Sequence, residues 1–301
     1  MHSAEAPGTL EFLRLLSPTI QDICISSGTS GLSLGVLHHG SVVFRDSHGY
    51  RDVEAQLKPD SDAVYGVASL TKAFTACLIG ILVDGGKRSW DEPVHSVLPG
   101  FQRDDEVKDA TITDFLTRQT GIARSNQYWF ADDNELLLKK DQIVPMVNSL
   151  RSVQPFRSAA APSNWNFALA GEVVEFVTGE SWADTVKSRL LDPLGLTRTT
   201  FWADNKKNID NLAKPYLALD DGSSHPIPYP QITKASIMSS AMGLRSTVND
   251  VLTWKKALLT GLTDQRRLGR GSAKDLPIKN LLTIMQGRCQ LTFSYPEKMA
   301  M

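Results

Sequence analysis

The scarcity of strand signals constrains the fold of this chain more than any other feature of its sequence. The clearest signal lies at 32–44, LSLGVLHHGSVVF, where two β-rich runs flank a polar HHGS turn, a pattern typical of a hairpin. Further along, Leu291, Phe293 and Tyr295 alternate with other residues and predict one more strand. Because a two-stranded hairpin is marginal by itself and its open edge invites pairing, we expect a thin sheet whose C-terminal strands are missing.

Helical periodicity fills most of the remaining chain. From Gly66 onward, apolar residues recur at helical spacing until Gly85, which predicts a helix over 69–84. N-cap residues, apolar periodicity and glycine stops predict further helices at 112–118, 135–151, 166–178, 181–191 and 247–260. After Gly261, the stretch 262–275 carries glycine and charge without periodicity, which predicts a loop. One hairpin among many helices indicates an α/β (α+β) protein.

Length and charge exclude several classes of function. A chain of 301 residues suits two closely packed lobes. Lys plus Arg number 32 against 33 Asp plus Glu, so no net field attracts a nucleic acid or an anionic membrane. No apolar run approaches the ~20 residues of a membrane span, and the first residues lack the pattern of a secretion signal. We therefore expect a cytoplasmic protein with no nucleic-acid or membrane partner, and its oligomeric state stays open.

Cysteine and histidine spacing argues against metals and cofactors. The three cysteines, Cys24, Cys77 and Cys289, are too few and too scattered for a disulfide framework or a zinc site, so we expect buried thiols. None of the six histidines has metal-ligand spacing to carboxylates or cysteines. The GTSG at 28–31 is not followed by a lysine and a helix, unlike a phosphate-binding loop. The sequence therefore predicts no metal and no cofactor.

A Ser-x-x-Lys motif opens the predicted helix at 69–84. Its spacing places Ser69 at the helix N-terminus and Lys72 one turn further on the same face. A lysine in a partly desolvated cleft has a lowered pKa and can take the proton of a serine hydroxyl, which makes the serine a nucleophile. Free N–H groups at the helix N-terminus can stabilise an oxyanion. The alternative is structural: Ser69 only caps the helix and Lys72 is a solvated charge.

The residues around this motif resemble the serine β-lactamase-related family. That family includes class C β-lactamases, D-alanyl-D-alanine carboxypeptidases, certain esterases and fungal acyltransferases of polyketide pathways. The similarity covers roughly residues 30–262 and consists of five ordered segments: VYGVASLTKAFTACLIGILVDGGKRSWDEPVHSVLPGF, DATITDFLTRQTGI, NWNFALAGEVVEFVTGESWADTV, LLDPLGLTRTTF and IMSSAMGLRSTVNDVLTWKKALL. In this family Ser-x-x-Lys is the first of three motifs. The resemblance implies that Ser69 is the acylated nucleophile and Lys72 its base partner.

The resemblance also implies a fold and a division of the chain. A β-lactamase/transpeptidase-like protein has an antiparallel sheet lobe and a helical lobe. Residues 1–65 would form the N-terminal part of the α/β lobe, 66–240 a mainly helical lobe that carries Ser-x-x-Lys, and 241–301 the start of a C-terminal α/β portion.

The second family motif, Tyr-x-Asn, is altered in this chain. It lies seven to nine residues before a glycine that corresponds to Gly171, which puts Asn164 at the substrate-binding asparagine position. The tyrosine position is Pro162, which has no proton to transfer. Tyr128 is the best candidate for a substitute phenol near the substrate, and a solvent-facing or packing role is its alternative.

The third family motif, Lys-Thr-Gly or His-x-Gly, has no match after the predicted helix at 247–260. The QTG at 119–121 and VTG at 177–179 end helices, and the HHG at 38–40 lies in the hairpin turn. The resemblance therefore implies a truncated chain, as a shortened gene model or a degenerate paralogue would produce.

Two functions stay open. In the first, a serine hydrolase or acyltransferase forms acyl-Ser69 from a small ester, thioester or amide and passes the acyl group to water or a metabolite hydroxyl. The similarity to fungal sequences favours secondary metabolism and a small-molecule partner. In the second, the altered motif at Pro162 and the missing third motif indicate a catalytically impaired or inactive relative, either a binding protein or a truncated gene product.

Overall fold

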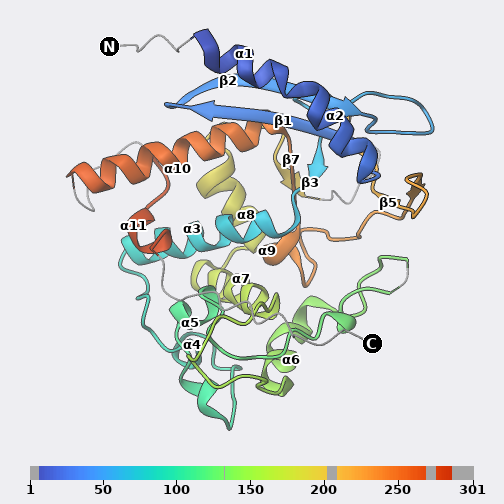
Figure 1. Cartoon of the computed structure of the whole chain (residues 1–301). Coiled ribbons are helices and arrows are strands. Elements are labelled where there is room, and N and C mark those ends of the chain that lie inside the picture. Colours follow the sequence, from blue (N-terminus) through green and yellow to red (C-terminus); the bar gives the residue numbers. More distant parts are fainter. Residues whose placement is uncertain (1–6, 132, 202–208, 269–275, 287–301) are drawn as a thin grey trace.

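The hairpin lies at one end of the molecule and most helices lie at the other (Figure 1). α1 (Pro7–Leu15) and α2 (Ser17–Ser26) run along the hairpin, and α10 (Val248–Leu268) lies between the hairpin and the other helices. This computed structural model describes residues 7–131, 133–201, 209–268 and 276–286. None of the helices in these four stretches has the length and apolar character that crossing a membrane requires.

The predicted hairpin is confirmed, and its second strand continues beyond the predicted end. β1 (Gly31–His38) pairs antiparallel with β2 (Ser41–Gly49). The turn between them has positive φ at His39 (47°) and Gly40 (77°), as two-residue primed turns require. The apolar side chains of β1 are half-buried, and none of them is fully buried.

Short strands elsewhere in the described residues form two further small sheets. One has the strand order β3-β7-β4 and joins segments far apart in the sequence, and the other is a second hairpin, β5-β6. The bounds are Tyr65–Gly66 for β3, Thr200–Phe201 for β4, Tyr216–Ala218 for β5, Ser224–Pro226 for β6 and Leu244–Ser246 for β7. The strand predicted around Leu291 lies outside the described residues.

The helix predicted at 69–84 is present. A 3₁₀ turn, η1 (Ala68–Leu70), leads into α3 (Thr71–Asp84), which ends at Gly85. Eight of the 14 residues of α3 are buried, because apolar side chains cover most of its circumference. The helix therefore runs through the protein rather than along its surface.

The remaining helices pack around α3. The helices predicted at 112–118, 166–178 and 181–191 correspond to α5, to α7, and to α8 followed by the π-helical turn η5. The bounds are Val94–Val97 for α4, Glu106–Asp109 for η2, Ile112–Leu116 for α5, Asn126–Tyr128 for η3, Lys140–Gln142 for η4, Ile143–Ser149 for α6, Trp165–Thr178 for α7, Trp182–Val186 for α8, Lys187–Leu191 for η5, Ser239–Met242 for α9 and Leu281–Ile284 for α11.

The helix predicted at 135–151 is wrong in its first half. α6 begins only at Ile143, two residues before Pro145. Proline lacks an N–H and clashes with the carbonyl four residues earlier, so it is tolerated in a first turn and not in a helix interior. Upstream of the proline, Phe130 and Leu136 pair instead in an isolated β-bridge.

The end predicted for the helix at 247–260 is also wrong. α10 continues through Gly261 to Leu268, so the first part of the predicted loop is helical. A Cβ at Gly261 would lie 2.7 Å from the Leu281 side chain, so glycine here permits the close approach of α11 rather than a helix stop. The rest of the predicted loop, 269–275, lies outside the described residues.

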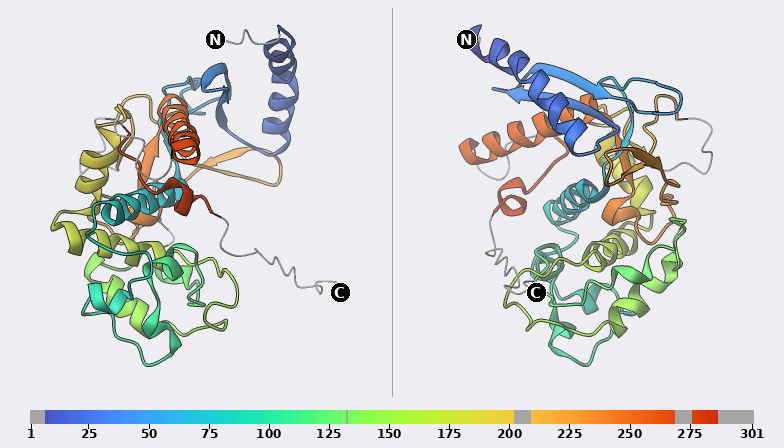
Figure 2. Two further views of the ribbon diagram at one scale, coloured as in Figure 1. Left: turned by 90° about the vertical axis from the view of Figure 1, so that its left-hand side faces the viewer. Right: turned by 45° about the vertical axis from the view of Figure 1, so that its right-hand side comes forward.

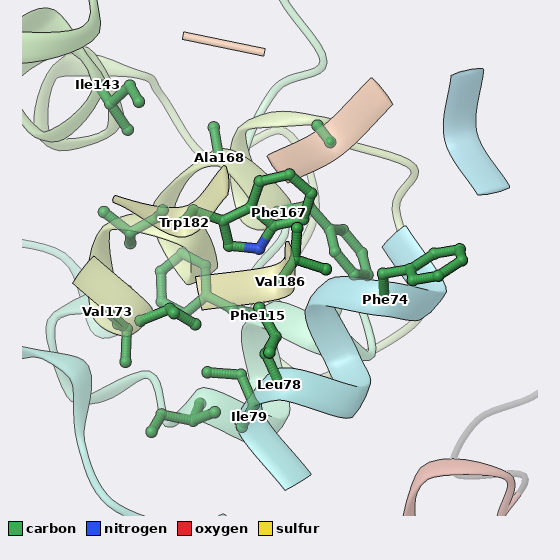
Figure 3. Packing of buried hydrophobic residues seen from close by; sticks show 14 of the residues in the cluster. Phe74, Leu78, Ile79, Phe115, Ile143, Phe167, Ala168, Val173, Trp182 and Val186 are labelled. Atoms are coloured by element: carbon green, nitrogen blue, oxygen red, sulfur yellow. The ribbon is translucent and has the colours of Figure 1, made fainter. Parts of the chain in front are cut away.

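One hydrophobic core contains residues from α3 through α11 but none from the β1–β2 hairpin. Figure 3 shows Phe74, Leu78 and Ile79 of α3 facing Phe167 and Trp182 from α7 and α8. No residue of α1, α2, β1 or β2 belongs to this core. Cys24 and Cys77 are buried free thiols, as predicted, and Cys289 lies outside the described residues.

α10 connects the hairpin to the helical core (Figure 2). A Cβ at Gly35 of β1 would lie 2.6 Å from Leu252, so strand and helix are in close contact. On the other side of α10, Trp254 stacks on Phe74 of α3 with ring centroids 4.1 Å apart. α10 thus returns to the hairpin although 199 residue positions separate Val248 from Gly49. The division into three segments stays a prediction.

Candidate active site

Ser69 occupies a strained turn between β3 and α3. Ala68, just before it, has a φ of 43°, which L residues rarely adopt. Val67 N–H donates to the carbonyl of Leu244 (3.0 Å), which holds the entry to this turn against β7. The side chain of Ser69 is exposed, and the N-cap of α3 is Leu70 without a side-chain cap. The alternative that Ser69 merely caps the helix is therefore wrong.

Lys72 points back to Ser69 from the first turn of α3. Its Nζ donates to Ser69 Oγ (2.8 Å) and to the backbone carbonyl of Ala241 (2.9 Å). The Phe167 ring lies 5.6 Å from the same nitrogen. Lys72 is half-buried, and burial together with the charge of Arg118 lowers its pKa to about 8. A lysine with this pKa is mostly protonated at pH 7, where roughly a tenth of it is neutral, and the neutral form can act as a base.

α9 fixes the relative positions of α3 and α7 around Lys72. Thr75 of α3 donates to the carbonyl of Ser240 (2.6 Å), and the Ser240 hydroxyl donates to the carbonyl of Phe167 (3.0 Å). A Cβ on Gly171 of α7 would lie 2.3 Å from Ser240 Oγ, so only glycine permits this approach. These contacts place the Ala241 carbonyl and the Phe167 ring against the lysine.

The backbone at Ser69 offers a donor for a developing oxyanion. Within the described residues, no backbone hydrogen bond is donated by Ser69 N–H, whereas the neighbouring Leu70 N–H donates to Val67 (3.0 Å). An unsatisfied N–H beside a nucleophile can stabilise the negative charge on a carbonyl oxygen under attack.

Asn164 and Tyr128 are not hydrogen-bonded to the Ser69–Lys72 pair in the described residues. Asn164 is the half-buried N-cap of α7, where its backbone carbonyl accepts from Phe167 and Ala168, and its side chain caps nothing. Tyr128 lies on η3 and is 46% exposed. No tyrosine hydroxyl among the described residues bonds to Ser69 or Lys72, so the substrate-binding roles predicted for Asn164 and Tyr128 stay predictions.

Three neighbours of Lys72 were not identified from the sequence. Phe167 lies three residues after Asn164, and Arg118 lies in the TRQTG stretch. Both therefore belong to segments that resemble the β-lactamase-related family. Ala241 contributes only its carbonyl, for which no side-chain signal exists.

A cavity of about 280 Å³ adjoins the strained turn. Its walls include Tyr65, Ala68, Tyr229, Met242 and Arg245. The Arg245 guanidinium lies 5.3 Å from the centre of the Tyr229 ring, and burial lowers the pKa of Arg245 to about 10. The cavity is mainly apolar with two cationic side chains, Lys214 and Arg245, and it lies beside the residue that precedes the nucleophile. No group of three or more His, Cys, Asp or Glu side chains in the described stretches could hold a metal ion.

The arrangement of a serine after a strained alanine, a half-buried lysine and a free N–H agrees with the comparison to known families. The family model described as beta-lactamase matches residues 16–283, which is most of the chain. The chain belongs to the beta-lactamase family.

Two curated relatives show how far the similarity extends. An unguisins hydrolase of Aspergillus campestris is 29% identical over 217 residues, which cover 67% of this chain and 39% of that protein. Protein flp of Staphylococcus aureus is 25% identical over 183 residues, which cover 59% of this chain and 36% of that protein. The chain therefore spans well under half the length of these relatives.

Two solved structures share the fold of this chain. The octameric penicillin-binding protein homologue of Pyrococcus abyssi has a TM-score of 0.72 and 23% identity, and the match covers 92% of this chain and 59% of that one. The class C beta lactamase of Rhodobacter sphaeroides has a TM-score of 0.67 and 22% identity, covering 86% and 67%. The predicted β-lactamase/transpeptidase-like fold, with sheet and helical regions, is confirmed.

Proposed function

We propose that this chain is a serine acyl-transfer enzyme that works through an acyl-Ser69 intermediate. The observation that carries the proposal is the 2.8 Å hydrogen bond between Lys72 Nζ and Ser69 Oγ. Burial also lowers the pKa of this lysine to about 8. A base at hydrogen-bond distance with a pKa near the working pH suits proton transfer from a serine.

The proposed reaction has two half-reactions. Neutral Lys72 takes the proton of Ser69 as Oγ bonds to the carbonyl carbon of an ester, thioester or amide, and Ser69 N–H stabilises the oxyanion. The bond to the leaving group then breaks, and the leaving group receives the proton from Lys72. In the second half-reaction, water or an alcohol gives its proton to Lys72 and its oxygen attacks the acyl carbon. The bond from that carbon to Ser69 Oγ then breaks, and Lys72 returns the proton to Ser69 Oγ.

The cavity beside Ala68 suits the acyl part of a small substrate. About 280 Å³ is close to the lower size of ligand-binding pockets, and its mainly apolar walls favour a compact apolar group. A small-molecule acyl substrate is therefore the proposed partner. The similarity to a fungal unguisins hydrolase supports a role in secondary metabolism, as a hydrolase or an acyltransferase. The cytoplasmic location expected from the sequence stays a prediction.

The second candidate is an impaired or inactive beta-lactamase-like protein that binds small molecules. Pro162 favours it, because the tyrosine position of the family motif has no hydroxyl and no other tyrosine of the described residues bonds to Lys72. In this case the Ser69–Lys72 hydrogen bond is a structural remnant.

Labelling with a fluorophosphonate, read by intact mass and peptide mapping, distinguishes the two candidates. We expect one adduct on Ser69 and none in Ser69→Ala, and Lys72→Met should slow labelling by about 10²- to 10⁴-fold because the base is lost. Ser163→Ala is the matched control, since Ser163 is a buried serine that bonds only to a backbone carbonyl (3.4 Å).

Two results would contradict the enzyme proposal. One is no adduct on the wild-type protein over hours, which favours the binding protein. The other is labelling that persists in Ser69→Ala, which removes Ser69 as the nucleophile. Where the protein does react with the fluorophosphonate, turnover of a chromogenic ester separates hydrolysis from acyl transfer. Added alcohols should accelerate product release only if the protein transfers the acyl group to an alcohol.

A further inference from the structure

Strand pairing places the buried cation Arg245 close to the nucleophile. Arg245 of β7 pairs with Gly66 of β3, and the Cα atoms of such a pair lie about 4.5–5.5 Å apart. Ser69 follows Gly66 by three residues, and the two strands lie beside the start of α3 (Figure 1). Arg245 is only 6% exposed. A buried charged side chain this near a nucleophile is a candidate for substrate recognition.

The cavity beside Ala68 extends to Arg245. Arg245, Gly66 and Ala68 all line this space of about 280 Å³. A Cβ built on Gly66 would meet no atom within 4 Å outside its immediate chain neighbours, so the space beside this glycine is open. The cavity therefore connects the residue before Ser69 with the strand that carries the cation.

The second cation of the cavity, Lys214, is already neutralised. Its Nζ donates to the carboxylates of Asp52 (2.9 Å) and Glu54 (3.1 Å), neither of which lines the cavity. Among the described residues, no Asp or Glu side chain lines the cavity at all. An anion that enters the cavity therefore meets the charge of Arg245 and no acidic wall that would repel it.

The surroundings of Arg245 suit a carboxylate. Its guanidinium lies 5.3 Å from the centre of the Tyr229 ring, a contact that orients the guanidinium plane. A guanidinium offers parallel N–H donors that match the two oxygens of a carboxylate. Burial lowers the pKa of Arg245 to about 10 because the charged form loses solvation, and a carboxylate beside it restores that stabilisation.

From the position of Arg245 in this cavity, we infer that the enzyme takes acyl groups whose chain ends in a carboxylate, and that Arg245 binds this carboxylate. The substrate class is the half esters, half thioesters or half amides of short dicarboxylic acids. The apolar walls, which include Ile232, Met242 and Leu244, contact the methylene groups between the two carboxyl carbons. This inference rests on the acyl-Ser69 mechanism proposed above and adds the identity of the acyl group.

Two chromogenic esters of equal chain length test the inference on the unaltered chain. The p-nitrophenyl half ester of glutaric acid carries a carboxylate at the end of its acyl chain, whereas p-nitrophenyl valerate carries a methyl group there. We expect kcat/KM to be about tenfold or more higher for the half ester, because hydrogen bonds between charged groups are strong. Arg245→Met should remove most of this preference, and Arg245→Lys should keep part of it. Arg45→Met is the matched control: it removes an exposed arginine of β2, outside the cavity, and should leave the preference unchanged.

Binding to Ser69→Ala gives a second readout that needs no turnover. Monomethyl glutarate should raise the melting temperature of Ser69→Ala progressively between about 0.1 and about 10 mM, whereas methyl valerate at the same concentrations should not. Adding Arg245→Met should weaken the binding of monomethyl glutarate by about tenfold or more, and adding Arg45→Met should not weaken it.

The outcomes separate this inference from the proposed mechanism. Equal kcat/KM for the two esters, with Ser69 still labelled by the fluorophosphonate, would overturn the inference and leave the mechanism intact. No turnover and no labelling, together with binding of monomethyl glutarate that depends on Arg245, would overturn the mechanism and support the cavity as a carboxylate site. Binding that Arg245→Met and Arg45→Met weaken equally would overturn the inference, and so would no binding at all.

Discussion

The region around α3 and the β1–β2 hairpin are stabilised in different ways. Eight of the 14 residues of α3 are buried, and five of these belong to a core shared with α5, α7 and α8, whereas β1 buries none of its eight. In β2 the one buried residue is His48, which bonds to Asp46 and Gln21 rather than to the core. The two regions meet mainly through α10.

This difference shows which part of the candidate site depends on which region. Ser69, Lys72 and their contacts with Ala241 and Phe167 belong to the densely packed region. The hairpin contributes only one wall of a pocket that is also lined by Leu70 and the start of α10. The geometry of the nucleophile and its base should therefore be maintained even where the hairpin is weakly held.

Removing a phenyl ring from each region should give the largest difference in the free energy of unfolding. Phe115→Ala removes a ring that is 1% exposed and packs edge-on against Phe101, with ring centroids 5.6 Å apart. We expect it to lower the free energy of unfolding by about 3–5 kcal/mol. Phe44→Ala in half-buried β2 should lower it by only about 1–1.5 kcal/mol. Urea unfolding monitored by circular dichroism measures both, and equal losses would break the comparison.

Adding a methyl group where α7 contacts α9 should lower the free energy of unfolding by a smaller amount. Gly171→Ala places a Cβ 2.3 Å from Ser240 Oγ, and the displaced helices should lower stability by about 1–3 kcal/mol. Because Ser240 bonds to Phe167, labelling of Ser69 should slow as well. Gly66→Ala is the control, since nothing lies within 4 Å of its added Cβ. Full stability and full labelling in Gly171→Ala would mean that α9 does not position Lys72.

Removing the charge of Arg118 should change only the pH dependence. The positive charge of Arg118 acts with burial to lower the Lys72 pKa. Arg118→Gln should therefore move the inflection of labelling against pH upward from about 8, by less than one pH unit, with stability little changed. Arg118→Lys keeps the charge and should restore the original inflection. An unchanged or lower inflection in Arg118→Gln would show that the charge of Arg118 does not lower the Lys72 pKa.

The sequence predicted best those elements whose residues carry the information locally. The hairpin turn at His39 and Gly40 and the stop of α7 at Gly179 need positive φ, and these residues signal it directly. Ser69 and Lys72 are one helical turn apart, so their contact follows from spacing. Proton transfer between them can be predicted from the sequence for the same reason.

The sequence failed where distant residues decide the conformation. Gly261 has the pattern of a helix stop, but its contact with Leu281 made it an interior residue of α10. Pro145 did signal the true start of α6, and apolar periodicity over 135–151 masked that signal. The Ala241 carbonyl lies 169 positions from Lys72, and no pattern in the sequence joins them.

The pH dependence of Ser69 labelling tests the central claim most directly. If the neutral form of half-buried Lys72 is the base, the labelling rate should rise about tenfold per pH unit below its pKa and level off above about 8. At pH 6 the rate should be about 100-fold below the plateau, and Lys72→Met should abolish the inflection. A rate that does not change between pH 6 and 10, or an inflection that persists in Lys72→Met, would contradict the assignment of Lys72 as the base.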